Sequence, residues 1–107
     1  MDETTYHRIV DGTLSHYAEK LEPAFESGAL DDLDLQGGVL TLVTARGTTL
    51  VISKHTASKQ LWLASPVSGG LHFSYDMSKQ HWHLPDGRLC DEVIVSELKI
   101  HGIDITL

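Results

Sequence analysis

The sequence predicts an α+β domain, a two-layer α/β sandwich in which two helices pack on one face of an antiparallel sheet of about six strands. Three observations predict it: apolar residues at helical spacing near the start, a central stretch of short apolar or alternating runs separated by glycine-containing turns, and a second helical pattern near the end. Because each helix is apolar along one stripe, both are most simply placed on the same sheet face. We expect residues 1–107 to form a single domain.

The first helix is predicted from Thr4 to about Phe25. Asp2 and Thr4 are candidate N-caps, and Ser27-Gly28 is a natural stop. Pro23 is expected to kink or fray the last turn, because proline has no backbone N–H to donate. The apolar residues recur every three or four positions, the period of one helix face; they are Tyr6, Ile9, Val10, Leu14, Tyr17, Leu21 and Phe25.

Six strands are predicted after Gly28. The connections Gln36-Gly37-Gly38 and Ala45-Arg46-Gly47 are short enough to force hairpins, which makes the neighbouring strands antiparallel. The predicted strands are Leu30–Gln36, Val39–Thr44, Thr48–Ser53, Gln60–Ser65, Leu71–Asp76 and His81–Leu84.

Successive side chains of a strand point to opposite faces of the sheet. If Leu61 and Leu63 face the helices, Trp62 between them must face solvent. A shift of one residue would reverse every such assignment and bury Trp62, so a different register stays an alternative. The residues predicted to face inward are Leu40, Leu42, Leu50, Ile52, Phe73, Tyr75, Trp82 and Leu84, and those predicted to face outward are Thr41, Val51, Ser53, Gln60, Ala64, His72, His81 and His83.

The second helix is predicted from about Leu89 to His101, with Gly102 as its stop. Cys90 occupies an apolar position of this helix, and we interpret it as an inert core thiol. As the single cysteine of the chain, it rules out an internal disulfide and a cysteine-based zinc site. The residues at helical spacing are Cys90, Val93, Ile94, Glu97 and Leu98.

The charge of the chain restricts its partners. It has 15 carboxylates against 8 lysines and arginines, a formal charge of −7, which repels nucleic acid and attracts cations or basic protein surfaces. No run approaches the roughly 18 apolar residues of a membrane span, so we expect no membrane partner. The acidic start Met1–Thr5 is unlike a signal or transit peptide, and we expect any targeting segment to be absent or already removed.

An acidic stripe is the first candidate site. Carboxylate oxygens are hard ligands for divalent and ferric ions, and an open cluster binds them weakly and exchangeably. His7, one turn before Asp11, is a candidate additional ligand. The alternative is a solvated helix face that only keeps the protein soluble. The carboxylates are Asp11, Glu19, Glu22 and Glu26 on the first helix and Asp31, Asp32 and Asp34 on the first strand, and we expect all seven to converge on one edge.

Two further candidates lie on the predicted outer sheet face. Trp62, with Ser53, Gln60 and His72 around it, is a candidate partner-binding residue, because large exposed aromatic side chains anchor interfaces. His81 and His83 share a strand face and could hold a borderline metal ion, although ordinary surface histidines are the alternative. The sequence has no phosphate-binding glycine loop, nucleophile elbow or zinc-protease helix, so nothing in it demands an enzyme.

Several segments resemble the frataxin family. They are Asp2–Tyr6, Gly38–Thr41, Lys59–Pro66 with Ser68-Gly69, and Glu97-Leu98, and the resemblance extends from Asp2 to about Leu98. It implies two helices on one face of an antiparallel sheet. It also implies weak binding of Fe2+ or Fe3+ on the acidic edge, and an outer sheet face that contacts the cysteine desulfurase and the iron–sulfur scaffold protein.

The implied role is that of a non-enzymatic activator and iron chaperone of iron–sulfur cluster assembly. The implied protein is a monomer with an iron-dependent oligomer as a further state, in the mitochondrial matrix or, alternatively, in the bacterial cytoplasm. Two alternative functions remain: an iron oxidation and storage protein with ferroxidase activity, and an acidic adaptor whose metal affinity is incidental. Departures from the family pattern include Ser53 and His55, which replace the common Asn and Gln, and His72, which replaces the Arg usual in mitochondrial members.

Overall fold

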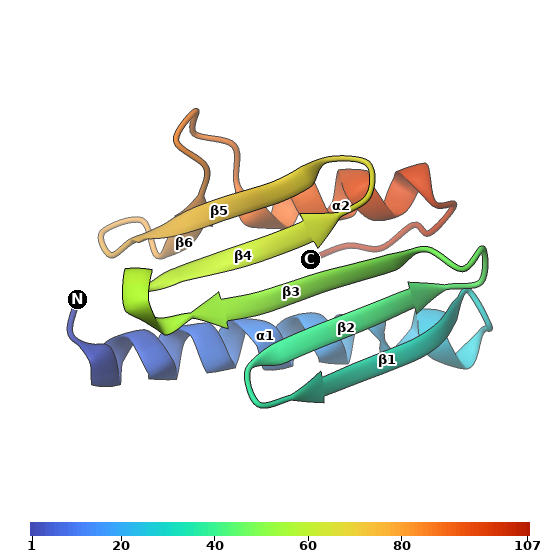
Figure 1. Cartoon of the computed structure of the whole chain (residues 1–107), viewed down its shortest axis with the longest axis horizontal. Helices are drawn as coiled ribbons and strands as arrows, with labels where there is room; N and C mark the ends of the chain where they lie inside the picture. Colours follow the sequence, from blue (N-terminus) through green and yellow to red (C-terminus); the bar gives the residue numbers. More distant parts are fainter.

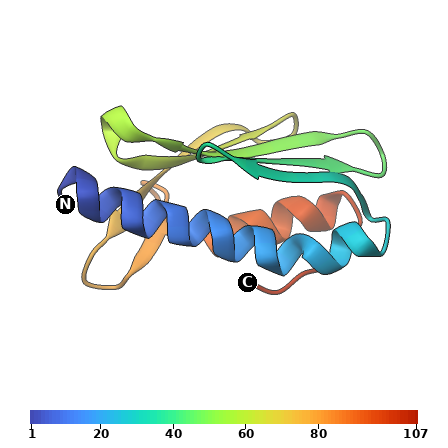
Figure 2. The same ribbon diagram turned by 90° about the horizontal axis from the view of Figure 1, so that it is seen from below.

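Both helices lie on one face of a six-stranded antiparallel sheet, as the sequence predicts (Figures 1 and 2). This computed structural model describes all residues from Met1 to Leu107. Neither helix combines the length and the apolar character that crossing a bilayer requires. The elements are α1 (Glu3–Glu26), β1 (Leu30–Gln36), β2 (Val39–Thr44), β3 (Thr49–His55), the short 3-10 helix η1 (Thr56–Ser58), β4 (Gln60–Ser65), β5 (Gly69–Asp76), β6 (His81–His83) and α2 (Cys90–Ile100).

The strands follow one another across the sheet in chain order, each antiparallel to the next. Trp62 on β4 lies opposite Ser53 on β3 and His72 on β5, and this pairing confirms the predicted register. The first strand contains a bulge between Leu30 and Asp32, because Asp31 has no partner on β2. β1 is an edge of the sheet, and β6 covers only the last part of β5.

The helix α1 is capped at both ends by hydrogen bonds, from a side chain at its start and from the backbone at its end. Asp2 caps its start, accepting a hydrogen bond from the backbone N–H of Thr5 at 2.7 Å. The prediction that Pro23 frays the last turn is wrong, since the helix continues to Glu26. The backbone N–H of Ser27 donates to the carbonyl of Pro23 at 3.0 Å, so the chain beyond the proline still closes the final turn.

The core lies between the helices and the inner sheet face. Its members include all the predicted inward residues except Tyr75, which is half-buried and packs on the core from its edge. Phe25 departs from the prediction and is 41 % exposed. The chain turns toward β1 just after it, and the small residues Ala24 and Ala29 pack against the core there instead.

Trp82 attaches the short strand β6 to the rest of the molecule. Its side chain is 4 % exposed and lies edge-on to Tyr75, with ring centres 5.0 Å apart, and to Tyr6, at 6.3 Å. The indole N–H donates to the Thr13 hydroxyl oxygen on α1 at 3.0 Å. Apart from its pairing with β5 and one bridge between His83 and Leu89, this strand of three residues is thus held to α1 by the Trp82 side chain.

The last turn of α2 buries an ionisable pair. Glu97 is 2 % exposed, and its Oε2 lies 3.9 Å from Nε2 of His101 one turn later. That separation exceeds a hydrogen bond, and neither group has another hydrogen-bond partner. After α2, Ile103 is buried again, and the C-terminal segment runs back alongside α1 (Figure 2).

Stability is expected to fall at alkaline pH, because Cys90 and Tyr17 are buried in their neutral forms. Burial raises the pKa of the Cys90 thiol from its ordinary value of 9.0 to about 12, and burial also raises the pKa of the Tyr17 hydroxyl, which donates to Asp91 Oδ1 at 2.5 Å. The unfolded chain then loses these protons at lower pH than the folded chain, so the free energy of unfolding decreases as pH rises above about 9.

The Cys90 contribution is expected to reach on the order of 4 kcal/mol near pH 12. Urea denaturation at pH 7, 9 and 10.5 follows the first part of this decline, with Cys90→Ala as the variant that should show a shallower one. Rapid reaction of the native protein with a thiol reagent at pH 8 would contradict the assignment.

Candidate functional site

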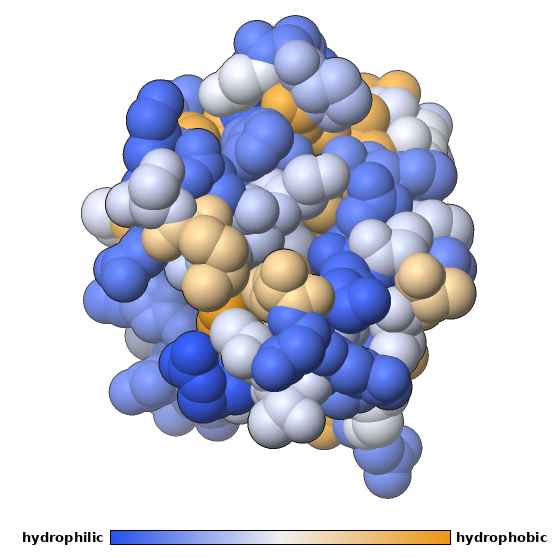
Figure 3. Space-filling view, turned by 90° about the vertical axis from the view of Figure 1, so that its left-hand side faces the viewer, coloured by the Kyte–Doolittle hydropathy of each residue, from blue (hydrophilic) through white to orange (hydrophobic).

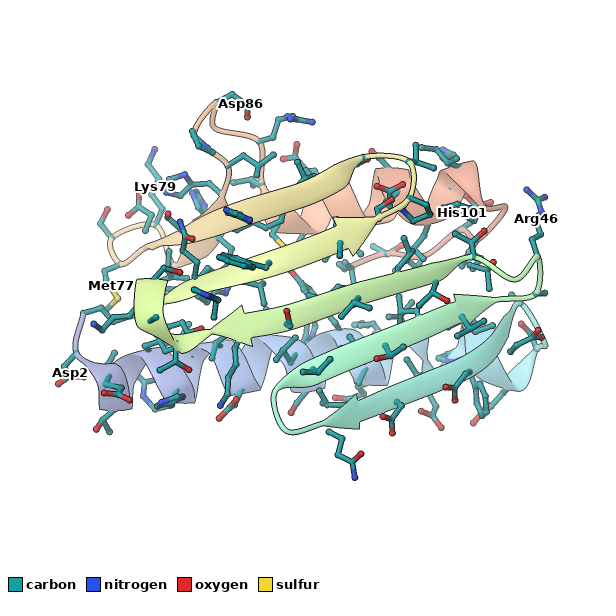
Figure 4. The ribbon with its side chains drawn as sticks, in the orientation of Figure 1. Asp2, Arg46, Met77, Lys79, Asp86 and His101 are labelled. Carbon is teal, nitrogen blue, oxygen red and sulfur yellow. The ribbon has the colours of Figure 1, made fainter.

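The predicted acidic residues lie along one long edge of the molecule, formed by α1 and β1. All seven carboxylates are exposed, and the four on α1 lie away from the buried face of the helix. Figure 4 shows carboxylate oxygens distributed along this edge rather than gathered at one point. Nowhere do three His, Cys, Asp or Glu side chains approach closely enough to hold one metal ion together.

The pairing of β1 explains this distribution. Leu33 lies opposite the buried Leu42 and packs against the core, so Asp32 and Asp34 on either side of it face the outer surface of the sheet. Asp31 occupies the bulge. The aspartates of β1 and the acids of α1 therefore share an edge but point in different directions.

A lysine from the sheet interrupts the acidic stripe near its N-terminal end. Lys54 shares a strand face with Ile52, so it points toward α1. Its Nζ donates to Oδ1 of Asp11 at 3.0 Å and to Nδ1 of His7 at 3.2 Å. Because an ammonium group only donates, Nδ1 of His7 must be the acceptor.

A glycine makes room for this lysine. A Cβ at Gly38 would lie 2.5 Å from Cε of Lys54, closer than real side-chain carbons approach each other. Gly38 also has φ of +78°, a conformation that glycine adopts without the strain of other residues. The hairpin between β1 and β2 is thus shaped so that the Lys54 side chain can pass toward Asp11.

Three stacked rings lie on the outer face of the sheet, one each on β3, β4 and β5. The Trp62 indole lies between the imidazoles of His55 and His72. Its ring centre is 3.7 Å from that of His55, with planes 8° apart, and 4.0 Å from that of His72, with planes 11° apart. Trp62 faces outward as predicted, but it is half-buried between its neighbours instead of standing free in solvent.

Hydrogen bonds fix the edge of the indole. Trp62 Nε1 donates to Oε1 of Gln60 at 3.0 Å, and the Gln60 amide donates to Ser74 Oγ at 3.4 Å. Ser53 lies directly across from Trp62 on β3. The structure therefore brings together the four predicted partner-facing residues and adds His55, which sequence reasoning noted only as a departure.

A rigid aromatic surface of this kind suits protein recognition. Stacking restricts the rotamers of all three rings before any partner arrives, so less conformational entropy is lost on binding. Tryptophan is also among the residues that contribute most to interface energies. The stacked rings lie on the outer face of the sheet, and the acids of α1 lie on the opposite layer, so the two surfaces could be used at the same time.

Comparison with known proteins agrees with these features. The sequence matches the model of the Frataxin-like domain over residues 1–102. It is 40 % identical over 93 residues to the iron-sulfur cluster assembly protein CyaY of Pseudomonas fluorescens, covering 86 % of this chain and 74 % of that protein. It is 36 % identical over 84 residues to the mitochondrial frataxin homolog of Schizosaccharomyces pombe, covering 77 % of this chain and 53 % of that protein.

Solved structures show the same architecture. The frataxin of Psychromonas ingrahamii superposes with a TM-score of 0.84 over 99 % of this chain and 97 % of that one, at 22 % identity, which bears on the fold alone. The trimeric frataxin of Saccharomyces cerevisiae, complexed with ferrous iron, has a TM-score of 0.75 at 30 % identity, over 87 % of this chain and 84 % of that one. By sequence and by fold, this chain belongs to the frataxin family.

Proposed function

We propose that this protein promotes iron–sulfur cluster assembly by docking the cysteine desulfurase and the scaffold protein on its Trp62 surface while holding iron weakly along the α1 and β1 edge. The observation that supports this most directly is the stack of His55, Trp62 and His72, a preformed aromatic surface on the exposed sheet face. The names of the relatives support the same pathway.

Iron is a cargo in this proposal, and the acidic edge has the chemistry to carry it loosely. The carboxylates are exposed and not arranged as a closed set of ligands, so water would complete the coordination of any bound ion. Weak, exchangeable binding suits delivery better than storage. A di-iron oxidase would instead need Glu and Glu-x-x-His ligands facing inward between helices, a motif that this sequence lacks.

The proposal applies equally in the mitochondrial matrix and in the bacterial cytoplasm, since relatives are known from mitochondria and from bacteria. The working form is a monomer, because a partner must reach the open outer face of the sheet. Iron-dependent assembly of several copies is a further state of the same chain.

An NMR titration tests the two surfaces separately. Ferrous iron, added anaerobically to the 15N-labelled protein, should broaden amide signals of α1 and β1, and the desulfurase–scaffold complex should then shift signals of β3, β4 and β5. The triple variant Asp11→Asn, Glu19→Gln, Glu22→Gln should reduce the iron broadening on α1 and the iron-dependent rate of cluster formation, while still binding the complex.

Two outcomes would contradict the proposal. Reduced iron broadening with an unchanged rate of cluster formation in the triple variant would leave the protein as an adaptor with incidental metal affinity. Absence of any shift on β3, β4 and β5 at saturating complex would remove the partner surface itself.

Replacing Lys54 by methionine is expected to strengthen iron binding at the start of the acidic stripe. The ammonium group contacts Asp11 and His7, so an incoming cation must displace it or be repelled by it. Methionine keeps most of the side-chain length without the charge. We expect affinity for Fe2+ at Asp11 to rise about 3- to 10-fold, the equivalent of roughly 1 kcal/mol.

Isothermal titration with Fe2+ under argon measures this change, and Lys20→Met on the exposed side of α1 is the matched control. An equal gain in both variants would mean that only net charge matters. No gain in either would show that Asp11 does not contribute to iron binding.

A further inference from the structure

A pair of histidines on β6 lies outside both surfaces described above. His81 and His83 flank the buried Trp82, so both imidazoles emerge on the opposite side of the strand and are partly exposed. Their ring centres are 5.9 Å apart and their planes are inclined by 80°. Neither ring belongs to the Trp62 stack, and neither contacts an acid of α1.

A backbone carbonyl determines which nitrogen of the His83 ring carries the hydrogen. Nδ1 of His83 lies 3.0 Å from the carbonyl oxygen of Leu84. A carbonyl oxygen only accepts, so Nδ1 carries the hydrogen and donates it. In the neutral ring, the lone pair is then on Nε2, which has no hydrogen-bond partner among the residues of this chain. Metal-binding histidines are commonly oriented in this way, with one ring nitrogen donating to a carbonyl and the other free to bind.

The separation of the two rings suits a shared ion. At a metal–nitrogen distance of about 2.0–2.1 Å, two imidazoles on one tetrahedral ion have ring centres about 5–6 Å apart. The observed 5.9 Å falls at the upper end of this range, so the two rings are spaced as two ligands of one such ion would be.

The surroundings favour a cation but do not add a third protein ligand. Asp76 lies directly across from His81 on β5 and contributes negative charge. Its Oδ1 already accepts hydrogen bonds from the backbone and hydroxyl of Ser78 and from the backbone of Lys79. The end of the molecule that bears the β5–β6 turn carries hydrophilic residues interspersed with apolar ones (Figure 3), and both histidines are partly exposed, so water can fill the remaining positions of the ion.

We propose that His81 and His83 form an open, two-imidazole site on β6 for a late first-row divalent ion. Imidazole nitrogen suits copper, nickel and zinc, and affinity should follow the order of the divalent series, with Cu2+ bound most tightly. This site is separate from the acidic edge, whose oxygen ligands suit iron. The protein would thus hold two classes of metal ion at two places.

Cu2+ titration of the labelled protein tests the site. At less than one equivalent, paramagnetic broadening should centre on residues 81–83 and their partners on β5, and the electron paramagnetic resonance spectrum should show coupling to two imidazole nitrogens. His81→Phe and His83→Phe keep a ring of similar size without its nitrogens. Each should lower Cu2+ affinity at least about 10-fold and leave coupling to one nitrogen at most.

Two controls distinguish this site from other histidines and from the acidic edge. His72→Ala removes an exposed imidazole of the Trp62 stack and should leave Cu2+ affinity within about twofold of the original value. The triple carboxylate variant of α1 should also retain the β6 signals. Broadening centred away from β6, or unchanged affinity in both phenylalanine variants with native circular dichroism, would overturn the proposal without affecting the proposed function.

Discussion

Replacing Trp82 by alanine is expected to lower the free energy of unfolding by about 3–5 kcal/mol. The side chain is almost fully buried, contacts Tyr6 and Tyr75, and donates a hydrogen bond to Thr13. Small domains are stable by only about 5–15 kcal/mol in total, so the variant should be close to unfolding at 37 °C. Urea denaturation followed by circular dichroism measures the change.

Trp82→Phe is the matched control for that prediction. Phenylalanine keeps most of the aromatic packing and loses the hydrogen bond to Thr13, which is worth about 1 kcal/mol. We expect a loss of about 1–2 kcal/mol, well below that of alanine. A loss below about 1 kcal/mol in the alanine variant would show that β6 is held by other contacts.

For Trp62 we expect the opposite: its replacement should weaken partner binding strongly and lower stability only slightly. Trp62→Ala is expected to weaken binding of the desulfurase–scaffold complex by about 30-fold or more, equivalent to at least about 2 kcal/mol. The indole is the centre of the stack with His55 and His72, and its loss leaves both imidazoles without a stacking partner. Because Trp62 lies outside the core, the free energy of unfolding should fall by no more than about 1–2 kcal/mol.

Surface plasmon resonance or the NMR titration measures the affinity, and Thr41→Ala is the control. Thr41 faces outward on β2 but does not touch the stack, so its replacement should change binding by less than about twofold. Wild-type affinity in the Trp62 variant would remove the aromatic stack as the docking surface. Equal losses in both variants would point to a broad contact without a central residue.

The sequence was sufficient to predict the architecture because glycines mark the turns between its strands. Glycines at 37 and 38 closed the first hairpin, and β1 and β2 were predicted with the bounds that they have in the structure. Alternation then placed Trp62 outward and Trp82 inward, as observed. The exceptions lie at the ends of elements: the last turn of α1 does not fray at Pro23, and Phe25 is exposed.

Lys54 and His55 contact the two candidate sites in ways that sequence reasoning did not predict. They also lie at the end of an element. The predicted third strand ended at Ser53, so alternation was not applied to them. β3 continues to His55 because Lys54 pairs with Leu61 and His55 with Gln60. These pairings depend on how η1 returns the chain to β4, a tertiary relation that no local pattern contains. Once the strand is extended, the same alternation directs Lys54 to α1 and His55 to Trp62.

The aspartates of β1 lie on an edge strand of the sheet. An edge strand exposes unpaired backbone groups that can join the edge of another sheet, and natural proteins block this with charges and bulges. β1 has both, since Asp32 and Asp34 accompany the bulge at Asp31. A cation bound by these side chains would neutralise the repulsion between two such edges. Self-association in the presence of iron would then begin at β1, and monovalent salt, which only screens the charges, should promote it much less.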